Sequence, residues 1–234
     1  MSRVVLCYIT DRSQLKTVSL VTVIRESLHA GVEMVQIREK DLPTRELTAL
    51  VEKALSAARE VSAAAQGFQP ASVSADVSSE AKDLRSAPPL RSYVLVNDRL
   101  DVALAAGAGG VHLGGQSMPA AEVRKVAPRP FVVGVSCHSL GEAMAAESAG
   151  ADYLLLGPVF ETPSKFKYGP PLGLVQLRKV TGQIRIPVLA LGGITVGRVR
   201  PCLEAGAAGI AGIRIFQDCE SIEALVHELR AQGE

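Results

Sequence analysis

The chain of 234 residues is 47% hydrophobic but only 4% aromatic. This length suits one α/β barrel or two small domains, and a core of aliphatic side chains is typical of parallel strands buried on both faces. With 25 basic and 24 acidic residues the formal net charge is +1, which gives no electrostatic reason to expect nucleic-acid binding or attachment to a membrane surface.

The cysteines and the start of the chain indicate the compartment. Cys7, Cys137, Cys202 and Cys219 form no CxxC pair and show no zinc-ligand spacing, so we expect reduced thiols that serve as small hydrophobic side chains. Met1 leads directly into a strand-like apolar run without a visible signal peptide. No apolar run reaches the roughly 18 residues that a membrane span needs. We therefore predict a cytoplasmic protein.

Short apolar runs alternate with segments of helical periodicity. The runs predicted as strands are Val4–Ile9, Val32–Ile37, Tyr93–Val96, Gly110–Leu113, Val132–Val135, Tyr153–Leu156, Val188–Leu191 and Gly209–Ile213. Helical spacing is clearest in Arg45–Val61, Ser139–Ala149 and Glu220–Arg230. Alternating strands and helices pair in parallel through right-handed crossovers, and eight such units close naturally into a barrel.

We therefore predict an α/β protein with a single TIM-type (β/α)8 barrel domain over residues 1–234. An open doubly wound sheet is the alternative, and the absence of a GxGxxG motif after the first strand disfavours it.

Residues 63–92 interrupt this alternation. The stretch is rich in Ala, Ser and Pro and shows no sustained period. It stands where an αβ connection of about two to six residues is expected, which in a barrel lies on the face opposite the active site. We predict a surface insertion, with a subunit contact as the alternative.

Three polar side chains close the second predicted strand: Gln36, Arg38 and Lys40. Alternation along a strand puts all three on one side, at the barrel end where active sites lie. A guanidinium beside an ammonium suits a pyrophosphate better than a single carboxylate. The alternative is a surface ion pair with Glu39 or Asp41.

The third predicted strand ends in Asn97 and Asp98. A carboxylate at this level could hold Mg2+, which usually binds one or two carboxylates together with phosphate oxygens of the substrate. The alternative is that Asp98 caps the following helix.

Later strand ends add hydroxyl groups and another cation. Ser136 and His138 follow the fifth strand, and Thr162, Ser164 and Lys165 follow the sixth. A lysine in a hydroxyl-rich loop is a plausible phosphate clamp and lid.

The last two strand ends carry features of a phosphate site. Gly193 belongs to a double glycine that lets backbone amides approach a ligand, and Thr195 is placed to cap the next helix. The eighth strand runs through Ile213 into Arg214. Loops after strands seven and eight often form the phosphate site of a barrel.

Motifs along nearly the whole chain, outside the predicted insertion, resemble those of the thiamine phosphate synthase family and occur in family order. They are Tyr8–Asp11, Gln36–Lys40, Asn97–Arg99, Gly110–Gly114, Gly134–Ser139, Gly150–Tyr153, Gly157–Phe160, Thr162–Lys165, Gly169–Gly173 and Pro187–Ile194.

The resemblance implies a transferase that joins hydroxymethylpyrimidine pyrophosphate to a thiazole phosphate and releases pyrophosphate. The resemblance also implies where each group binds. The pyrimidine would lie near Gln36, Asn97 and Ser136, and the pyrophosphate among Arg38, Lys40, Asn97 and Lys165. Mg2+ would bind Asp98, and the thiazole phosphate would bind at Thr162, Ser164, Gly193 and the backbone near Ile213.

Two positions depart from the family pattern. Ser117 stands where the family usually has a second acidic metal ligand, and Arg214 stands where it usually has a serine. These departures raise two alternatives: a thiazole tautomerase without a metal, for which His138 would be the acid–base residue, and a non-catalytic protein that binds thiamine precursors. In each case we expect phosphorylated small molecules as partners, and homologous barrels often pair, so a homodimer is possible.

Overall fold

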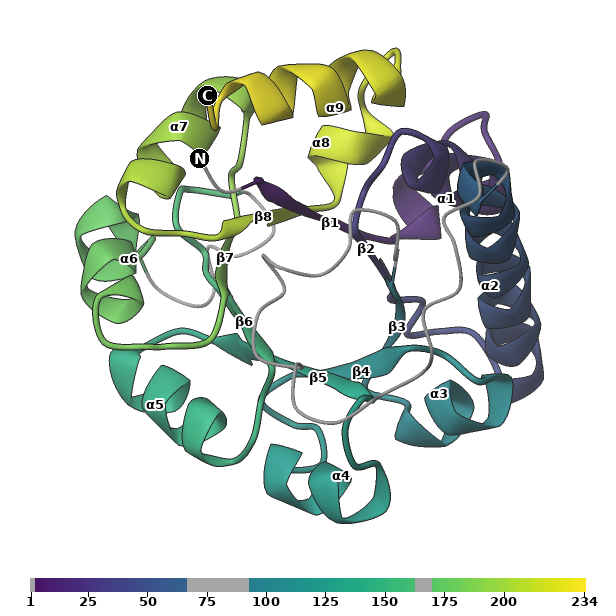
Figure 1. Ribbon diagram of the computed structural model, residues 1–234, viewed down its shortest axis with the longest axis horizontal. Coiled ribbons are helices and arrows are strands. Elements are labelled where there is room, and N and C mark those ends of the chain that lie inside the picture. Colours follow the sequence, from purple (N-terminus) through teal and green to yellow (C-terminus); the bar gives the residue numbers. More distant parts are fainter. Residues whose placement is uncertain (1–2, 67–92, 163–169) are drawn as a thin grey trace.

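The computed structural model describes residues 3–66, 93–162 and 170–234. Eight parallel strands close into a barrel in the order of the chain, with β8 paired to β1 (Figure 1). The strands are β1 Val5–Ile9, β2 Met34–Ile37, β3 Tyr93–Asn97, β4 Gly110–Leu113, β5 Val132–Cys137, β6 Tyr153–Leu156, β7 Val188–Leu191 and β8 Gly209–Gly212. The predicted (β/α)8 barrel is confirmed.

Helices surround the barrel on its outside (Figure 1). They are α1 Leu20–His29, α2 Thr44–Gln66, α3 Leu100–Ala106, α4 Ala120–Val126, α5 Leu140–Ser148, α6 Gly173–Thr181, α7 Val196–Glu204, α8 Arg214–Gln217 and α9 Ile222–Ala231, with a short 3-10 helix at Arg12–Gln14. None of the helices in the described ranges is long and apolar enough to cross a membrane.

The boundary of the predicted insertion needs correction. The second helix does not stop at Val61 but continues to Gln66, so the first four residues of the 63–92 stretch are helical. Three of these four are alanines, the residue with the highest helix propensity, and this preference outweighs the loss of an apolar period. Residues 67–92 lie outside the described part of the chain.

Alternate strand residues face two different cores. One set packs against the helices, as Tyr8 does against Phe216 of α8. The other set fills the barrel and includes Met34, Tyr153 and Leu155. Because parallel strands in a barrel are covered on both sides, the strands are apolar along most of their length. All four cysteines are free thiols.

The amino-terminal ends of the strands are held by half-buried ion pairs. Arg230 of α9 forms an ion pair of 2.8 Å with Glu33 and donates to the carbonyl of Val4. On the other side of the barrel, Arg124 of α4 binds Asp152, whose carboxylate also accepts from the amide of Val133. These contacts tie α9 and α4 to the starts of the neighbouring strands.

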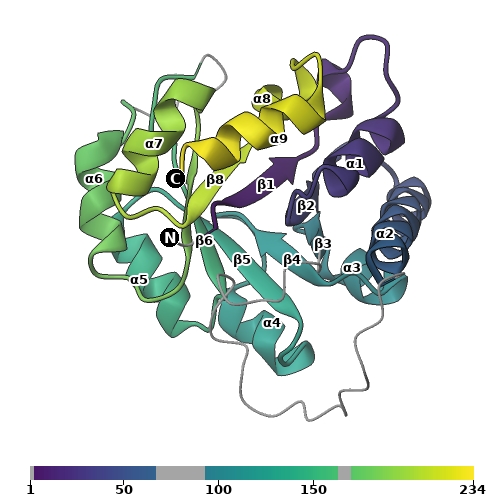
Figure 2. The same ribbon diagram turned by 45° about the horizontal axis from the view of Figure 1, so that its top comes forward.

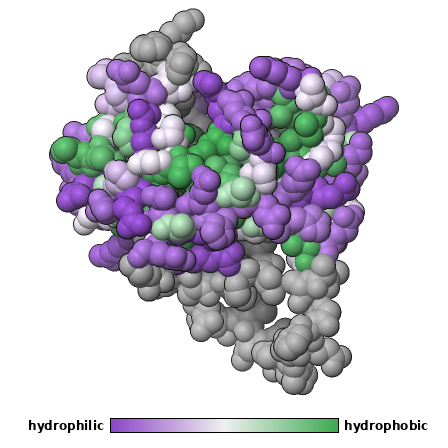
Figure 3. All heavy atoms as spheres, turned by 90° about the horizontal axis from the view of Figure 1, so that it is seen from above, coloured by the Kyte–Doolittle hydropathy of each residue, from purple (hydrophilic) through white to green (hydrophobic). Residues whose placement is uncertain are grey.

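Two further views show the tilt of the strands and the polarity of the outer surface. The strands cross the barrel obliquely, with the helices packed along its outside (Figure 2). One outer face is largely hydrophilic with hydrophobic groups gathered near its middle (Figure 3).

Candidate active site

Gln36 and Asn97 meet inside the barrel near the carboxyl ends of β2 and β3. The Gln36 amide donates to Oδ1 of Asn97 at 2.8 Å. Gln36 is 1% exposed, and its Oε1 has no hydrogen-bond partner in the described chain. A buried acceptor without a donor is costly unless a ligand or water supplies one. This pair therefore has one acceptor atom left for a ligand.

Arg38 and Lys40 follow Gln36 without local ion pairs. The carboxylate of Glu39 is 2% exposed and accepts hydrogen bonds from Thr10 and Arg12. Asp41 also binds Arg12, through both guanidinium nitrogens at 2.6 Å. The alternative of an ion pair with Glu39 or Asp41 is therefore wrong: neither Arg38 nor Lys40 is paired with a carboxylate within the described ranges.

The same Arg12 contacts fix the end of β2. Hydrogen bonding to Asp41 and Glu39 raises the pKa of Arg12, and the bonded guanidinium lowers the pKa of Asp41. Thr10 accepts a 2.8 Å hydrogen bond from the amide of Arg38. Because these acidic groups are occupied, the two cations at the mouth stay free to bind an anion.

Asp98 lies at the mouth of the barrel in a strained backbone conformation. Its φ of 61° is in the left-handed region that few residues other than glycine adopt. Its Oδ2 accepts from Asn97 at 2.6 Å, and its Oδ1 accepts from the hydroxyl of Ser117 and from the amide of Gly114. The helix-capping alternative for Asp98 is wrong, because Arg99 is the N-cap of α3 and the Asp98 carboxylate is bonded to Asn97, Gly114 and Ser117 instead.

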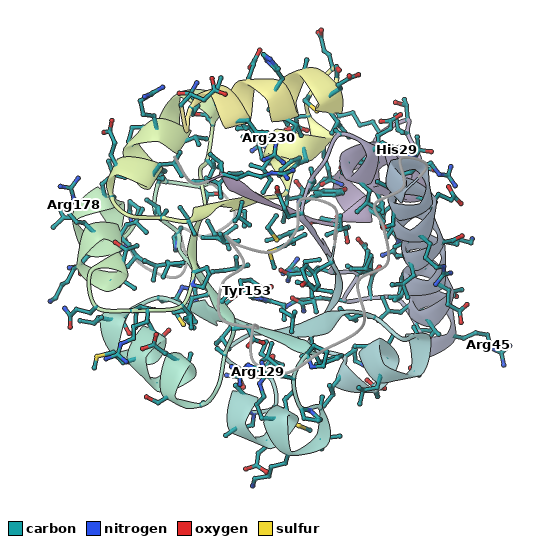
Figure 4. All side chains as sticks on the ribbon, viewed as in Figure 1. His29, Arg45, Arg129, Tyr153, Arg178 and Arg230 are labelled. Atoms are coloured by element: carbon teal, nitrogen blue, oxygen red, sulfur yellow. The ribbon has the colours of Figure 1, made fainter. Side chains whose placement is uncertain are left out.

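Three side chains from the neighbouring strands β4, β5 and β6 form a hydrogen-bonded chain beside Asn97. The imidazole of His112 lies 2.9 Å from the hydroxyl of Tyr153 and 2.8 Å from that of Ser136. Asn97 and His112 occupy paired positions on β3 and β4. Burial lowers the pKa of His112 to about 3, so the ring is neutral at physiological pH. Figure 4 shows Tyr153 within the ring of strands.

His138 follows β5 on the exposed mouth. Its Nδ1 contacts the carbonyl of Gly157, which can only accept, so Nδ1 carries a proton there. Its backbone amide donates to Glu142 at 2.7 Å. The Nε2 atom of this exposed ring has no hydrogen-bond partner in the described part of the chain, so it is available to form a hydrogen bond with a ligand.

The loops after β6 and β7 are joined by glycine and a cation. Gly193 has a φ of 64°, and a Cβ there would overlap Glu161 and Phe160. Arg198 of α7 donates to the carbonyl of Gly193 at 2.7 Å and lies 4.7 Å from the centre of the Phe160 ring. Thr162 is half-buried beside this junction. Thr195 is the N-cap of α7, but its side chain makes no capping hydrogen bond.

At the end of β8, Ile213 is the N-cap of α8 and is half-buried. The Arg214 guanidinium is exposed and bound to Asp218 at 3.1 Å, one turn along the chain. Ser164 and Lys165, both predicted site residues, lie outside the described residues.

Reasoning from the sequence missed two side chains that support the site. Tyr153 was expected only as a strand residue, although it faces into the barrel and its hydroxyl lies 2.9 Å from the imidazole of His112. Arg198 carried no predicted role, although its charge so close to the double glycine was a usable signal.

The fold and the mouth together define a class: a (β/α)8-barrel enzyme with cations at the carboxyl ends of its strands that no described carboxylate pairs with. A family model described as thiamine monophosphate synthase matches residues 6–65 and 74–216. The chain belongs to this family, which makes it a transferase of thiamine biosynthesis.

Individual relatives agree with the family match. A relative from Geobacter sulfurreducens is 43% identical over 87% of this chain and 82% of its own. The thiamine-phosphate synthase of Methanospirillum hungatei is 36% identical over 88% of this chain and 85% of its own. The solved structure of a thiamine phosphate pyrophosphorylase from Pyrococcus furiosus superposes with a TM-score of 0.77 at 34% identity, covering 98% of this chain and 95% of the other.

Proposed function

We propose that this enzyme couples hydroxymethylpyrimidine pyrophosphate to a thiazole phosphate, giving thiamine phosphate and pyrophosphate. The observation that carries the proposal is a pair of cations, Arg38 and Lys40, that bind no carboxylate of the described residues and follow the buried amide of Gln36, which is bonded to Asn97. This combination offers positive charge for a pyrophosphate and a polar, desolvated surface for a heteroaromatic ring.

The reaction needs charge neutralisation more than a protein nucleophile. The bond between the pyrimidine methylene carbon and the pyrophosphate oxygen breaks, and the electron pair leaves with the pyrophosphate. The thiazole nitrogen then forms the new C–N bond with its lone pair. Arg38 and Lys40 would stabilise the departing charge, and Lys165 would add a third cation. Holding both substrates in one mouth supplies the alignment.

Different strand ends would hold the two substrates. We place the pyrimidine against Gln36, Asn97 and Ser136, all on the barrel interior. The thiazole phosphate would lie across the barrel at Thr162, Ser164, Gly193 and the backbone at Ile213. Arg214 is bound to Asp218, which favours a contribution from the backbone rather than from this guanidinium.

The residues at the mouth fit Mg2+ only in part. Asp98 supplies one carboxylate and Ser117 a neutral oxygen, and Mg2+ prefers such oxygen ligands. Within the described residues, no three His, Cys, Asp or Glu side chains are grouped to hold a metal ion. We therefore propose that Asp98 and Ser117 hold Mg2+ only together with pyrophosphate oxygens. When bound, the ion would offset the charge of the leaving group.

The test is incubation of the purified chain with both substrates and Mg2+, with thiamine phosphate measured through its fluorescent oxidation product. Equal amounts of thiamine phosphate and pyrophosphate are expected. If folded protein formed no thiamine phosphate, the proposal would be wrong. Conversion of thiazole carboxylate phosphate alone would identify a tautomerase with His138 as its acid–base residue. Binding of both substrates by calorimetry without turnover would identify a carrier. A homodimer and a cytoplasmic location stay predictions from the sequence.

A further inference from the structure

A hydrogen-bonded chain of three side chains lies beneath the proposed pyrimidine site. It runs from Tyr153 on β6 through His112 on β4 to Ser136 on β5, with distances of 2.9 and 2.8 Å. Tyr153 is fully buried and His112 is 1% exposed, whereas Ser136 is half-buried at the upper end. The chain therefore connects the closed interior of the barrel to the site.

The buried end of this chain sets the direction of its hydrogen bonds. The only hydrogen-bond partner of the Tyr153 hydroxyl among the described residues is Nδ1 of His112. Burial raises the pKa of Tyr153 well above 10, so the phenol keeps its proton. A buried O–H group without an acceptor is costly, so this proton points at Nδ1. Nδ1 of His112 therefore acts as the acceptor and carries no proton.

This arrangement fixes the other ring nitrogen. His112 is 1% exposed, and its two ring partners are hydroxyl groups rather than carboxylates. An imidazole with a bare Nδ1 has its proton on Nε2. Nε2 then donates to Oγ of Ser136 at 2.8 Å. The Ser136 hydroxyl thus accepts a hydrogen bond from His112, and its own proton has no acceptor in the described part of the chain.

We infer that Tyr153 and His112 are positioning residues that make Ser136 a hydrogen-bond donor toward the site, so that the site selects a ligand presenting an acceptor nitrogen. A pyrimidine ring nitrogen fits this requirement, and a C–H group at the same position does not. The identity of the ligand rests on the proposed function, whereas the direction of the hydrogen bonds does not.

The packing around Tyr153 supports a dedicated arrangement. Gly134 is paired with Tyr153 between β5 and β6, and a Cβ at position 134 would overlap the phenol ring. The ring therefore occupies space left free by a neighbouring glycine, with its hydroxyl turned to His112. A purely apolar filler of this space would need no hydroxyl.

The direction of the hydrogen bonds can be tested without substrate. Long-range 1H–15N NMR of the histidine rings should show His112 protonated on Nε2 and bare on Nδ1 in the wild-type chain. Tyr153→Phe should shift the His112 signals, because Nδ1 loses its donor. The matched control is Tyr8→Phe, since the Tyr8 hydroxyl is buried in the outer core without a hydrogen-bond partner in the described residues. A proton on Nδ1 in the wild type would overturn the inference.

Selectivity provides the second measurement. Calorimetry should compare hydroxymethylpyrimidine pyrophosphate with analogues in which each ring nitrogen in turn is replaced by C–H. The wild type should bind one analogue about tenfold more weakly, the effect of one lost hydrogen bond. This factor should fall below about threefold in Tyr153→Phe and in Ser136→Ala, and should persist in Tyr8→Phe. If Ser136→Ala still bound the analogue about as much more weakly as the wild type does, the inference would be overturned. This test holds even if Tyr153→Phe fails to fold.

The two proposals fail in different ways. A wild type that binds no pyrimidine pyrophosphate at all would contradict the proposed function and the assigned ligand. The NMR spectrum of the free chain would still decide whether Ser136 is held as a donor.

Discussion

The hydroxyl of Ser117 donates a hydrogen bond to Oδ1 of Asp98. A neutral side chain therefore lies against this carboxylate at the position where the family resemblance implies a second acidic metal ligand. The carboxylate is also bonded by Asn97 and Gly114, so its charge is already partly satisfied by the protein. A cation that binds at this position therefore faces one formal negative charge, that of Asp98.

A second carboxylate should tighten metal binding. Ser117→Asp is expected to lower the Mg2+ concentration needed for half-maximal turnover by about tenfold, since Mg2+ sites commonly use two carboxylates. The measurement is a Mg2+ titration of thiamine phosphate formation. Ser56→Asp, on the exposed side of α2, is the matched control and should leave the titration unchanged. An unaltered Mg2+ response in Ser117→Asp would place Ser117 outside any metal site.

Arg38 and Lys40 should affect the binding of the pyrimidine pyrophosphate but not that of the thiazole phosphate. Lys40→Met and Arg38→Met are each expected to raise the KM for hydroxymethylpyrimidine pyrophosphate at least about tenfold, because hydrogen bonds to charged groups contribute about 1.5–3 kcal/mol. The KM for the thiazole phosphate should change by less than about threefold. Steady-state kinetics with each substrate varied in turn makes the comparison.

Lys53→Met removes another exposed lysine, from the outer helix α2, and should leave both constants unchanged. Equal increases for the two substrates in Lys40→Met would contradict the assignment of this cation to the pyrophosphate.

The sequence was enough to predict the barrel, because each strand is a short apolar run bounded by polar residues or glycine. The partners of the site residues were harder to predict. Glu39 and Asp41 were plausible partners for their neighbours, but Arg12 binds both from 27 and 29 residues away. Such a pairing depends on how β1 and β2 align in three dimensions. Alternation within β6 put Tyr153 and Leu155 on one side, yet only closure of the barrel decides that this side faces inward.

Burial of His112 should make folding stability depend on pH. Its pKa is lowered from 6.5 to about 3 by desolvation, with a smaller contribution from Arg38 and an opposing one from Asp98. Between these values the unfolded state binds the extra proton and the folded state does not, so stability is present above pH 6.5 and is lost as the pH falls. From about pH 7 to about pH 5, this group should lower the free energy of unfolding by about 2 kcal/mol.

Urea denaturation at the two pH values measures that loss. His112→Gln cannot take up the proton and should lose about 2 kcal/mol less than the wild type over the same interval. His227→Gln, an exposed change on α9, should retain the wild-type dependence. A His112→Gln chain with the full wild-type loss would assign the pH dependence to other groups.

Gly134 should be intolerant of even one methyl group. A Cβ at this position would overlap the ring of Tyr153, which is fully buried and cannot move into solvent. Overpacking of a core typically costs about 1–3 kcal/mol, so Gly134→Ala should lower the free energy of unfolding by this amount. Gly141→Ala is the matched control, because a Cβ on this exposed residue of α5 meets nothing within 4 Å. Alanine favours a helix over glycine by about 1 kcal/mol, so the control should be neutral or more stable in the same urea denaturation. Equal stability of Gly134→Ala and the wild type would mean that Tyr153 can shift, and the hydrogen bond to His112 would then lack the rigid packing that the interior layer provides.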